Sequence, residues 1–319
     1  MKKYPVLISG AGQLGSRYLQ GLAKCRLPLR IYVQDKYEAS LDCARQRWSE
    51  VFVPGSTHEV SFHLAVELLP PQIDIAIVAT TADVRPKVVS DITRQSTVRY
   101  WVLEKLLAQD GSGLDAILSD TKNGSAAWVN TPRRMMSWHQ EIKSQLGLGY
   151  PLLFNVKGGS WGLACNAVHF LDLIAWWTNE SLETVFTDRL SPHWFESKRS
   201  GFSEVLGTLV ANFSGGSQAI LNAGEETESI SLEVSDAQRS WLIKESEGLA
   251  KRSDGLEITG RMAYQSEMSA SLVESILERG CCGLPTLEES VDLHRIFIGG
   301  MLTHWRQAGN PSATYIPAT

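Results

Sequence analysis

The sequence lacks the features that define several classes of protein. Its five cysteines are odd in number and show no C-x-x-C spacing, which argues against a disulfide framework and a structural zinc site. No apolar stretch approaches the roughly 20 residues that a membrane-spanning helix needs. The formal net charge is -5 and no run is rich in Lys or Arg, so nucleic acid is a poor partner.

We also expect no targeting signal at the start of the sequence. The apolar run that follows Lys3 is too short for the core of a signal peptide, so we expect the mature chain to start at Met1. Scattered cysteines favour a reducing compartment. We therefore expect a cytoplasmic protein that binds a small molecule, holds no metal ion and has no contact with membranes.

The residues that are present predict two domains. A chain of 319 residues with 43% hydrophobic residues can build two cores. Its first part alternates short apolar, β-branched runs with helical patterns, as βαβ units do. We predict an α/β fold in which residues 1–129 form a doubly wound parallel sheet. The predicted strands are 5–9, 29–34, 73–79, 100–103 and 126–129, and the predicted helices are 13–24 and 40–48.

The pattern changes near residue 130, where Thr131 can cap a helix and Pro132 suits its first position. Residues 130–319 are predicted to form an α+β domain with a largely antiparallel open sheet. Its segment 229–235 alternates apolar and polar residues, so one sheet face should be exposed and should pack sheet to sheet in a homo-oligomer, a dimer or tetramer. The predicted strands are 152–157, 183–190, 204–213, 218–222, 229–235 and 240–244, and the helices are 132–146, 166–177 and two that close the chain, the first stopped at Gly280 and the second capped at Thr286.

A glycine-rich sequence predicts the cofactor. The first predicted strand runs into G-A-G-Q-L-G at residues 10–15, which opens a predicted helix. In a Rossmann dinucleotide site such glycines allow a tight turn, approach to a pyrophosphate, and close packing of helix on strand. Asp35 ends the next predicted strand, 20 residues after Gly15, where a carboxylate can bind ribose hydroxyls. The predicted cofactor contacts here are Gly10, Gly12, Gln13, Leu14, Gly15 and Asp35. The alternative is that the glycines only form a turn and Asp35 caps a helix.

Asp35 also bears on which dinucleotide binds. Its charge would repel a 2′-phosphate, so NAD is favoured over NADP, although the adjacent Lys36 weakens that argument.

Glu104 and Lys105 follow a later strand, at the edge where open α/β sheets bind ligands. An ammonium there can polarise a substrate oxygen. A solvated charge pair is the alternative.

The second domain contributes a possible acid–base group. Trp161 lies in a Gly-rich loop that leads to Asn166, His169 and Asp172, and the His-x-x-Asp spacing puts both side chains on one helical face. Imidazole transfers protons near neutral pH, and a carboxylate one turn away can fix its tautomer. The alternatives are a structural His–Asp pair and, for Trp161, a packing residue rather than one that lines a pocket.

Together these elements resemble the glucose-fructose oxidoreductase and inositol dehydrogenase (Gfo/Idh/MocA) superfamily over nearly the whole chain. The further matching segments are Ala79-Thr80-Thr81, Glu104-Lys105 in place of E-K-P, Asn130 with Arg133-Arg134, and His169-x-x-Asp172. The resemblance implies an NAD(P)-dependent oxidoreductase that acts on a secondary carbinol or ketone of a sugar, cyclitol or sugar nucleotide. It further implies that Lys105 stabilises the substrate oxygen and that His169 is the acid–base group. With these roles we expect Asp172 to assist His169, Thr80 and Glu104 to contact the cofactor, and Trp161 and Asn166 to contact substrate.

Two residues depart from that pattern. Cys165 stands where the family commonly has an Asp, and a thiol with a pKa near ~8.5 replaces a carboxylate poorly. Leu106 stands at the position of the family's Pro. Two functions therefore remain open at this point: an oxidoreductase, and a dinucleotide-binding sensor or scaffold without redox turnover.

Overall fold

The computed structural model describes residues 2–53, 55–147, 150–225, 228–236 and 238–319. The chain forms two compact units: a first unit of Met1–Ala108, Ser112–Asn130 and Ala263–Glu288, and a second unit of Gln109–Gly111, Thr131–Met262 and Glu289–Thr319. The domain boundary between residues 129 and 130 stays a prediction. The compact units differ from that division chiefly in Ala263–Glu288, which belongs to the first unit.

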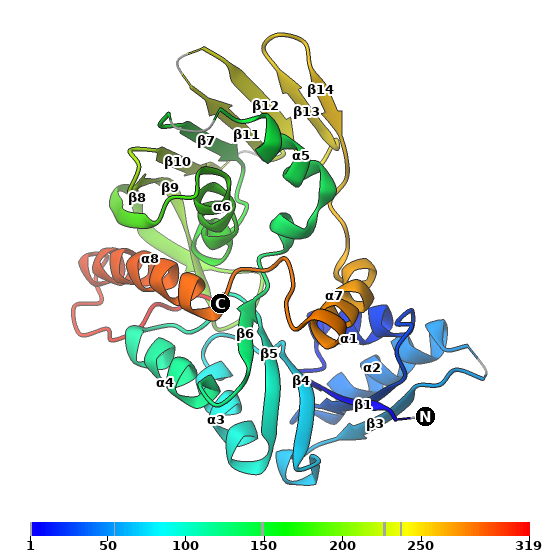
Figure 1. Cartoon of the computed structure of the whole chain (residues 1–319). Coiled ribbons are helices and arrows are strands. Elements are labelled where there is room, and N and C mark those ends of the chain that lie inside the picture. The colour runs from blue at the N-terminus through cyan, green and yellow to red at the C-terminus, as the bar shows by residue number, and fades with distance from the viewer. Residues whose placement is uncertain (1, 54, 148–149, 226–227, 237) are drawn as a thin grey trace. The chain divides into compact units, whose positions relative to one another are not determined.

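The first unit is built on a six-stranded sheet of parallel strands, ordered β3-β2-β1-β4-β5-β6 (Figure 1). Its inner strands are nearly continuous apolar runs because helices cover both faces. Val6, Leu7 and Ile8 of β1, for example, are fully buried. The strands are β1 (Tyr4–Ser9), β2 (Leu29–Gln34), β3 (Glu59–His63), β4 (Gln72–Val78), β5 (Thr97–Leu103) and β6 (Ala126–Val129), with helices α1 (Gln13–Leu22), α2 (Glu38–Val51), η1 (Val66–Leu68), α3 (Arg85–Gln95) and α4 (Gly111–Thr121) between them.

Helix α7 (Gln265–Arg279) packs against α1 in the first unit, and Figure 1 draws it beside the blue α1. Small residues allow the close approach. A Cβ on Gly21 would lie 2.7 Å from the Cβ of Ser269. The predicted stop of α7 is confirmed, because Gly280 ends the helix with a φ of 69°.

The second unit holds an eight-stranded, mostly antiparallel sheet in the order β14-β13-β12-β11-β7-β10-β9-β8 (Figure 1). The pair β7–β10 is parallel. The strands are β7 (Leu153–Gly158), β8 (Leu182–Glu196), β9 (Ser203–Phe213), β10 (Gln218–Ala223), β11 (Ser231–Ser235), β12 (Ser240–Lys244), β13 (Leu249–Arg252) and β14 (Glu257–Thr259), and the helices are η2 (Pro132–Met135), α5 (Ser137–Gln145), α6 (Leu163–Thr178) and α8 (Leu287–Gln307), whose first residues lie in the first unit.

The two faces of this sheet differ as the alternation of 229–235 predicts. Leu232 and Val234 of β11 are buried, whereas Glu233 between them is exposed. The strand registers put Glu233 in one row with two exposed apolar residues, Phe186 and Leu242. The outer face thus carries both charged and large apolar side chains.

Several predicted bounds need correction. The single helix expected from Pro132 is split into η2 and α5, because Met136 between them has an extended backbone. Strand β3 was missed, since it is an edge strand whose sequence E-V-S-F-H carries no buried apolar run. The short strands β13 and β14 were missed as well. They are three or four residues long, too short for a period to show.

Candidate functional site

The glycine loop between β1 and α1 has the close contacts that a dinucleotide cradle needs. Gly10 has a φ of 92°, and a Cβ there would lie 2.9 Å from the main chain of Thr80. A Cβ on Gly15 would lie 1.7 Å from the carbonyl oxygen of Gly10. Above Gly12, by contrast, no described atom lies within 4 Å of the position that a Cβ would occupy. The backbone is therefore tightly packed at Gly10 and Gly15 and open at Gly12. The next residue, Gln13, is also exposed.

Asp35 lies half-buried at the carboxyl end of β2, next to this loop. Its carboxylate accepts hydrogen bonds from the main-chain nitrogens of Ala11 (2.7 Å) and Tyr37 (2.9 Å). The guanidinium of Arg47, on α2, donates to the main-chain oxygen (3.1 Å) and side-chain oxygen (2.5 Å) of Gln13. One negative and one positive side chain thus contact the loop from the β2–α2 side. Because Tyr37 is the N-cap residue of α2, its bond to Asp35 also connects the carboxylate to the start of that helix. The alternative in which Asp35 caps the helix therefore stays open.

Glu104 is the centre of a buried network at the carboxyl end of β5. It is 4% exposed and accepts hydrogen bonds from the Tyr18 hydroxyl (2.7 Å) and the Asn130 amide (2.6 Å). Burial raises the pKa of Glu104, against the opposing effect of these bonds and of the cations of Arg85 and Lys105. Burial likewise raises the pKa of Tyr18, so the phenol stays a donor. The alternative of a solvated charge pair is therefore wrong for Glu104.

Lys105 is half-buried directly after β5, and the peptide bond between Lys105 and Leu106 is cis. The fully buried guanidinium of Arg85, at the start of α3, donates to the main-chain oxygens of Leu106 and Leu107, the latter at 3.2 Å, and to that of Thr80. Thr80 and Lys105, two predicted site residues, thus belong to loops that share one buried cation.

In the second unit, the loop before α6 orders the other predicted residues. The amide of Asn166 donates to the main-chain oxygen of Trp161 (2.9 Å), whose indole nitrogen donates to the main-chain oxygen of Asn222 (2.8 Å). The carboxylate of Glu204, 7% exposed, accepts from the main-chain nitrogens of Ala164 (2.8 Å) and Cys165 (3.2 Å). A buried carboxylate therefore caps the start of α6, beside the cysteine that stands at the family's Asp position.

His169 lies half-buried on α6, one turn after Cys165, and Asp172 is buried. Arg134 of η2 binds Asp172 in a two-pronged ion pair, through Nε (3.0 Å) and Nη2 (2.7 Å). Burial raises the pKa of Asp172, although Arg134 opposes the shift. Both carboxylate oxygens of Asp172 thus accept hydrogen bonds from Arg134. A direct role of Asp172 in fixing the tautomer of His169 stays a prediction.

A second buried ion pair lies next to the first in the sequence. Arg133 donates to both carboxylate oxygens of Glu245, at 2.7 and 2.6 Å, and its guanidinium stacks on the ring of Phe170 (4.4 Å to the centroid). His139 Nε2 lies 3.1 Å from the same carboxylate. Burial raises the pKa of Glu245, but Arg133 and His139 outweigh it and hold the pKa far below its usual value. Consecutive arginines thus fix η2 to α6 and to the end of β12.

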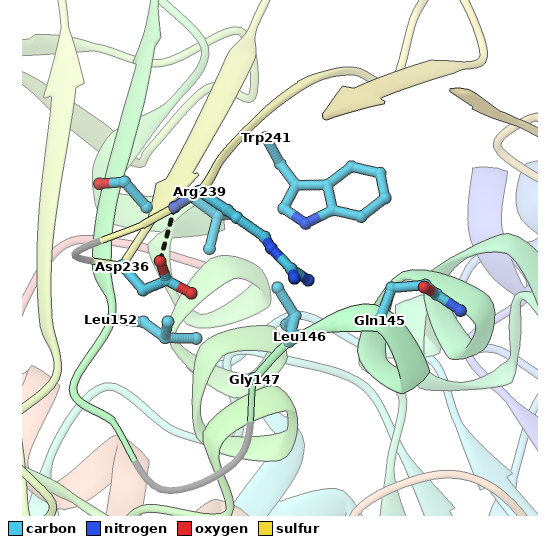
Figure 2. A pocket seen from close by; sticks show the side chains of 9 residues that line it. Gln145, Leu146, Gly147, Leu152, Asp236, Arg239 and Trp241 are labelled. Carbon is cyan, nitrogen blue, oxygen red and sulfur yellow. Dashed lines mark hydrogen bonds between the residues drawn. The ribbon is translucent and has the colours of Figure 1, made fainter. Parts of the chain in front are cut away.

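Two hollows lie elsewhere. One, between the end of α5 and the β11–β12 turn, has a volume of only about 10 Å³, room for about one water (Figure 2). In it the Asp236 carboxylate accepts from the Arg239 main-chain nitrogen. The other, of about 310 Å³, opens at the amino ends of β5 and β6, the edge of the sheet opposite the glycine loop. Neither has the place in the fold that a dinucleotide requires.

The glycine loop fits a dinucleotide, and its residues supply the test. An open space at Gly12, an exposed helix start and a carboxylate at the end of β2 are what a pyrophosphate and a ribose need. In the described part of the chain, no group of three or more His, Cys, Asp or Glu side chains is placed to hold a metal ion. The described helices also include none that is long and apolar enough to cross a membrane.

The chain shares its fold with solved structures of oxidoreductases, among them dehydrogenases of cyclitols and sugars. Levoglucosan dehydrogenase in complex with NADH matches at a TM-score of 0.71, with 12% identity over 96% of this chain and 98% of that one. Scyllo-inositol dehydrogenase from Lactobacillus casei, with bound NAD(H) and scyllo-inositol, matches at 0.68, with 14% identity over 96% and 98%. UDP-N-acetylglucosamine 3-dehydrogenase from Acidithiobacillus ferrooxidans matches at 0.68, with 13% identity over 98% and 99%. No family model and no curated protein matches the sequence.

Sequence reasoning missed several residues that hold this site. Tyr18 lies in the predicted helix 13–24 and was not among the predicted site residues, although a buried phenol needs a hydrogen-bond partner and so gives a signal. Arg85 and Arg47 lie on helices with nothing in their spacing to mark them. Glu204 and Glu245 lie near strand ends far from their partners in sequence, so only folding reveals those contacts.

Proposed function

We propose that this protein is an NAD(P)-dependent oxidoreductase that acts on a secondary carbinol or ketone of a sugar, cyclitol or sugar nucleotide. The observation that carries the proposal is the carboxyl edge of the parallel sheet. There the open glycine loop, Asp35 and the segment Glu104-Lys105 lie at the ends of β1, β2 and β5. The fold shared with dehydrogenases of cyclitols and sugars supports the substrate class.

The proposed cofactor is NAD. The pyrophosphate would lie on the start of α1, over Gly12, Gln13 and Leu14, and the adenosine ribose would bind Asp35. A 2′-phosphate would meet the carboxylate of Asp35, which favours NAD over NADP. When bound, the nicotinamide ring supplies the hydride acceptor or donor.

The chain's own residues are proposed to supply proton transfer and charge stabilisation. Lys105 would donate a hydrogen bond to the substrate oxygen and stabilise its developing charge. His169 would take up or deliver the hydroxyl proton. Asp172, held by Arg134, would keep α6 and its imidazole in place, and Trp161 and Asn166 would contact substrate.

A dinucleotide sensor or scaffold without turnover is the second candidate. It is favoured by Cys165, whose thiol donates to the main-chain oxygen of Thr319 where the family resemblance implies a carboxylate. A thiol held as a hydrogen-bond donor does not offer the two acceptor oxygens of a carboxylate.

One experiment separates the two functions. The purified protein is titrated with NADH and NADPH by fluorescence, and sugars, cyclitols and sugar nucleotides are then screened for a change in nicotinamide absorbance. Turnover that Lys105→Ala and His169→Ala each abolish, with NADH binding retained, is the expected result. Binding without any turnover favours the sensor. Failure of both dinucleotides to bind would reject the cofactor proposal.

We also propose a homo-oligomer formed through the outer face of the second unit's sheet. Phe186, Leu242 and Leu153 are each at least 40% exposed on its strands, and such exposed apolar residues favour an interface. Light scattering at micromolar concentration should give a dimer or tetramer, and Leu242→Lys should shift it towards the monomer. A monomer in the wild type would reject this proposal.

A further inference from the structure

Arg85 is a buried cation whose bonds go to the main chain. It is 1% exposed at the start of α3 and donates to the carbonyl oxygens of Thr80, Leu106 and Leu107. An arginine normally keeps its head group in water, because burying a charge is costly unless it is satisfied. The carboxylate of Glu104 lies near enough to interact with it electrostatically. This site is therefore built to hold the guanidinium.

The three carbonyl groups belong to two loops of the candidate site. Thr80 follows β4, and Leu106 and Leu107 follow Lys105 at the end of β5. Because β4 and β5 are neighbouring parallel strands, both loops leave the sheet at the same edge. In a Rossmann fold the adenosine half of a dinucleotide lies over the strands on one side of the glycine loop, and the second nucleotide half over the strands on the other. Here β2 and β3 are on the side of Asp35, and β4 to β6 are on the side of Arg85.

The chemistry of the side chain suits this bridging role. A guanidinium has five N–H donors in a rigid planar fork and stays charged at every physiological pH. One such group can bind three carbonyl oxygens at once, whereas the ammonium of lysine is a compact point charge on a flexible stem. Arg85 thus links the loop after β4 to the segment after β5 through hydrogen bonds to both.

We propose that Arg85 is a positioning residue that fixes the loop after β4 and the segment Lys105–Leu107, and thereby shapes the nicotinamide half of the cofactor site. The inference rests on the proposed function, since it assigns this half of the site to a nicotinamide nucleotide. It predicts that loss of the guanidinium weakens binding of the whole dinucleotide but leaves its adenosine half unaffected.

The test compares two ligands and three variants of the full chain. Arg85→Lys keeps the charge and loses the fork, and Arg85→Gln removes the charge and retains an amide donor. Arg94→Lys is the matched control on the same helix, because Arg94 is 70% exposed and pairs with Asp91. Affinities for NADH and for ADP-ribose, which lacks the nicotinamide, are measured by calorimetry after circular dichroism has shown that each variant is folded.

We expect both Arg85 variants to lose at least about tenfold in NADH affinity, the size of effect that one charged hydrogen bond supplies, and less than about twofold in ADP-ribose affinity. Unchanged NADH affinity overturns the proposal. Equal losses for both ligands overturn it too, since they would mark Arg85 as a general determinant of the fold. If Arg85→Lys does not fold, Arg85→Gln decides by the same criterion.

Hydrogen exchange provides a readout that needs no ligand. In the unliganded protein, peptides that cover residues 104–108 should exchange faster in the Arg85 variants than in the wild type and Arg94→Lys. Unchanged exchange there overturns the positioning role even if the wild type binds NADH. Failure of the wild type to bind either nucleotide rejects the proposed function instead, and the exchange rates then decide on Arg85 alone.

Discussion

Replacing Glu245 by Gln should destabilise the second unit strongly. The carboxylate accepts two short hydrogen bonds from Arg133 and lies 3.1 Å from His139, with side-chain exposures of 11% for Arg133, 9% for Glu245 and 0% for His139. The substitution keeps the volume but leaves a buried guanidinium without its counter-charge. Breaking a buried pair in this way costs about 3–5 kcal/mol. For a unit of this size, that corresponds to a fall of about 6–20 °C in Tm.

The measurement is urea unfolding at pH 7, followed by tryptophan fluorescence, because urea leaves the ionic strength unchanged. Arg133→Met and the double variant complete a mutant cycle, and we expect a coupling free energy of about 2 kcal/mol or more. Glu247→Gln is the control, since its pair with Lys244 is about half exposed and solvent screens it. An unfolding free energy of Glu245→Gln within about 0.5 kcal/mol of the wild-type value would refute the reasoning.

The pH dependence gives a second check on the same pair. The pKa of Glu245 lies below its usual value of 4.5 in the folded chain, so the unfolded chain binds the proton first as pH falls. The stabilisation is therefore complete above about pH 4.5 and is lost below it, by about 1.4 kcal/mol per pH unit. The difference in unfolding free energy between the wild type and Glu245→Gln should stay constant from about pH 5.5 to 7.5 and should be smaller at about pH 3.5. A gap that widens on acidification would contradict this sign.

Three further predictions concern the glycine loop, Asp35 and Asp172. Gly15→Ala should abolish NADH binding and lower stability, because the added methyl group would overlap the carbonyl oxygen of Gly10. Gly12→Ala should fold normally and lose only NADH affinity, and thermal melts and NADH titrations test both variants. Asp35→Ser should shift the ratio of NADPH to NADH affinity upward by about tenfold, and an unchanged ratio would reject its role in cofactor choice. If Arg134 and Asp172 position His169, Asp172→Asn should lower kcat by a larger factor than it raises KM. Activity equal to that of the wild type would mean that the ion pair contributes only to stability.

Short-range patterns predicted the parallel sheet well. Strands β2 and β6 begin and end at the predicted residues, because each is a short run rich in apolar residues with turn-forming residues on both sides, Pro28 and Asp35 for β2 and Ser125 and Asn130 for β6. The antiparallel sheet was predicted less completely. Its last two strands are three or four residues long, and Met136 breaks a helical pattern that continues in the sequence on both sides. Propensity cannot show such a break, since packing of the flanking segments decides it.

By itself the sequence determined what local chemistry requires. The glycines at 10, 12 and 15 and Asp35 lie within 26 residues of each other, so their spacing and the strand–helix context predict their arrangement. Only the tertiary structure decided what surrounds the charged groups. In the folded chain, Glu104 accepts hydrogen bonds from a hydroxyl and an amide, and Asp172 pairs with Arg134. The guanidinium of Arg85 binds main-chain oxygens of two loops. Apart from Thr80, which lies five residues before Arg85, those partners are at least 21 residues away in the sequence. Burial, which makes a partner necessary for a charged group, exists only once the chain has folded.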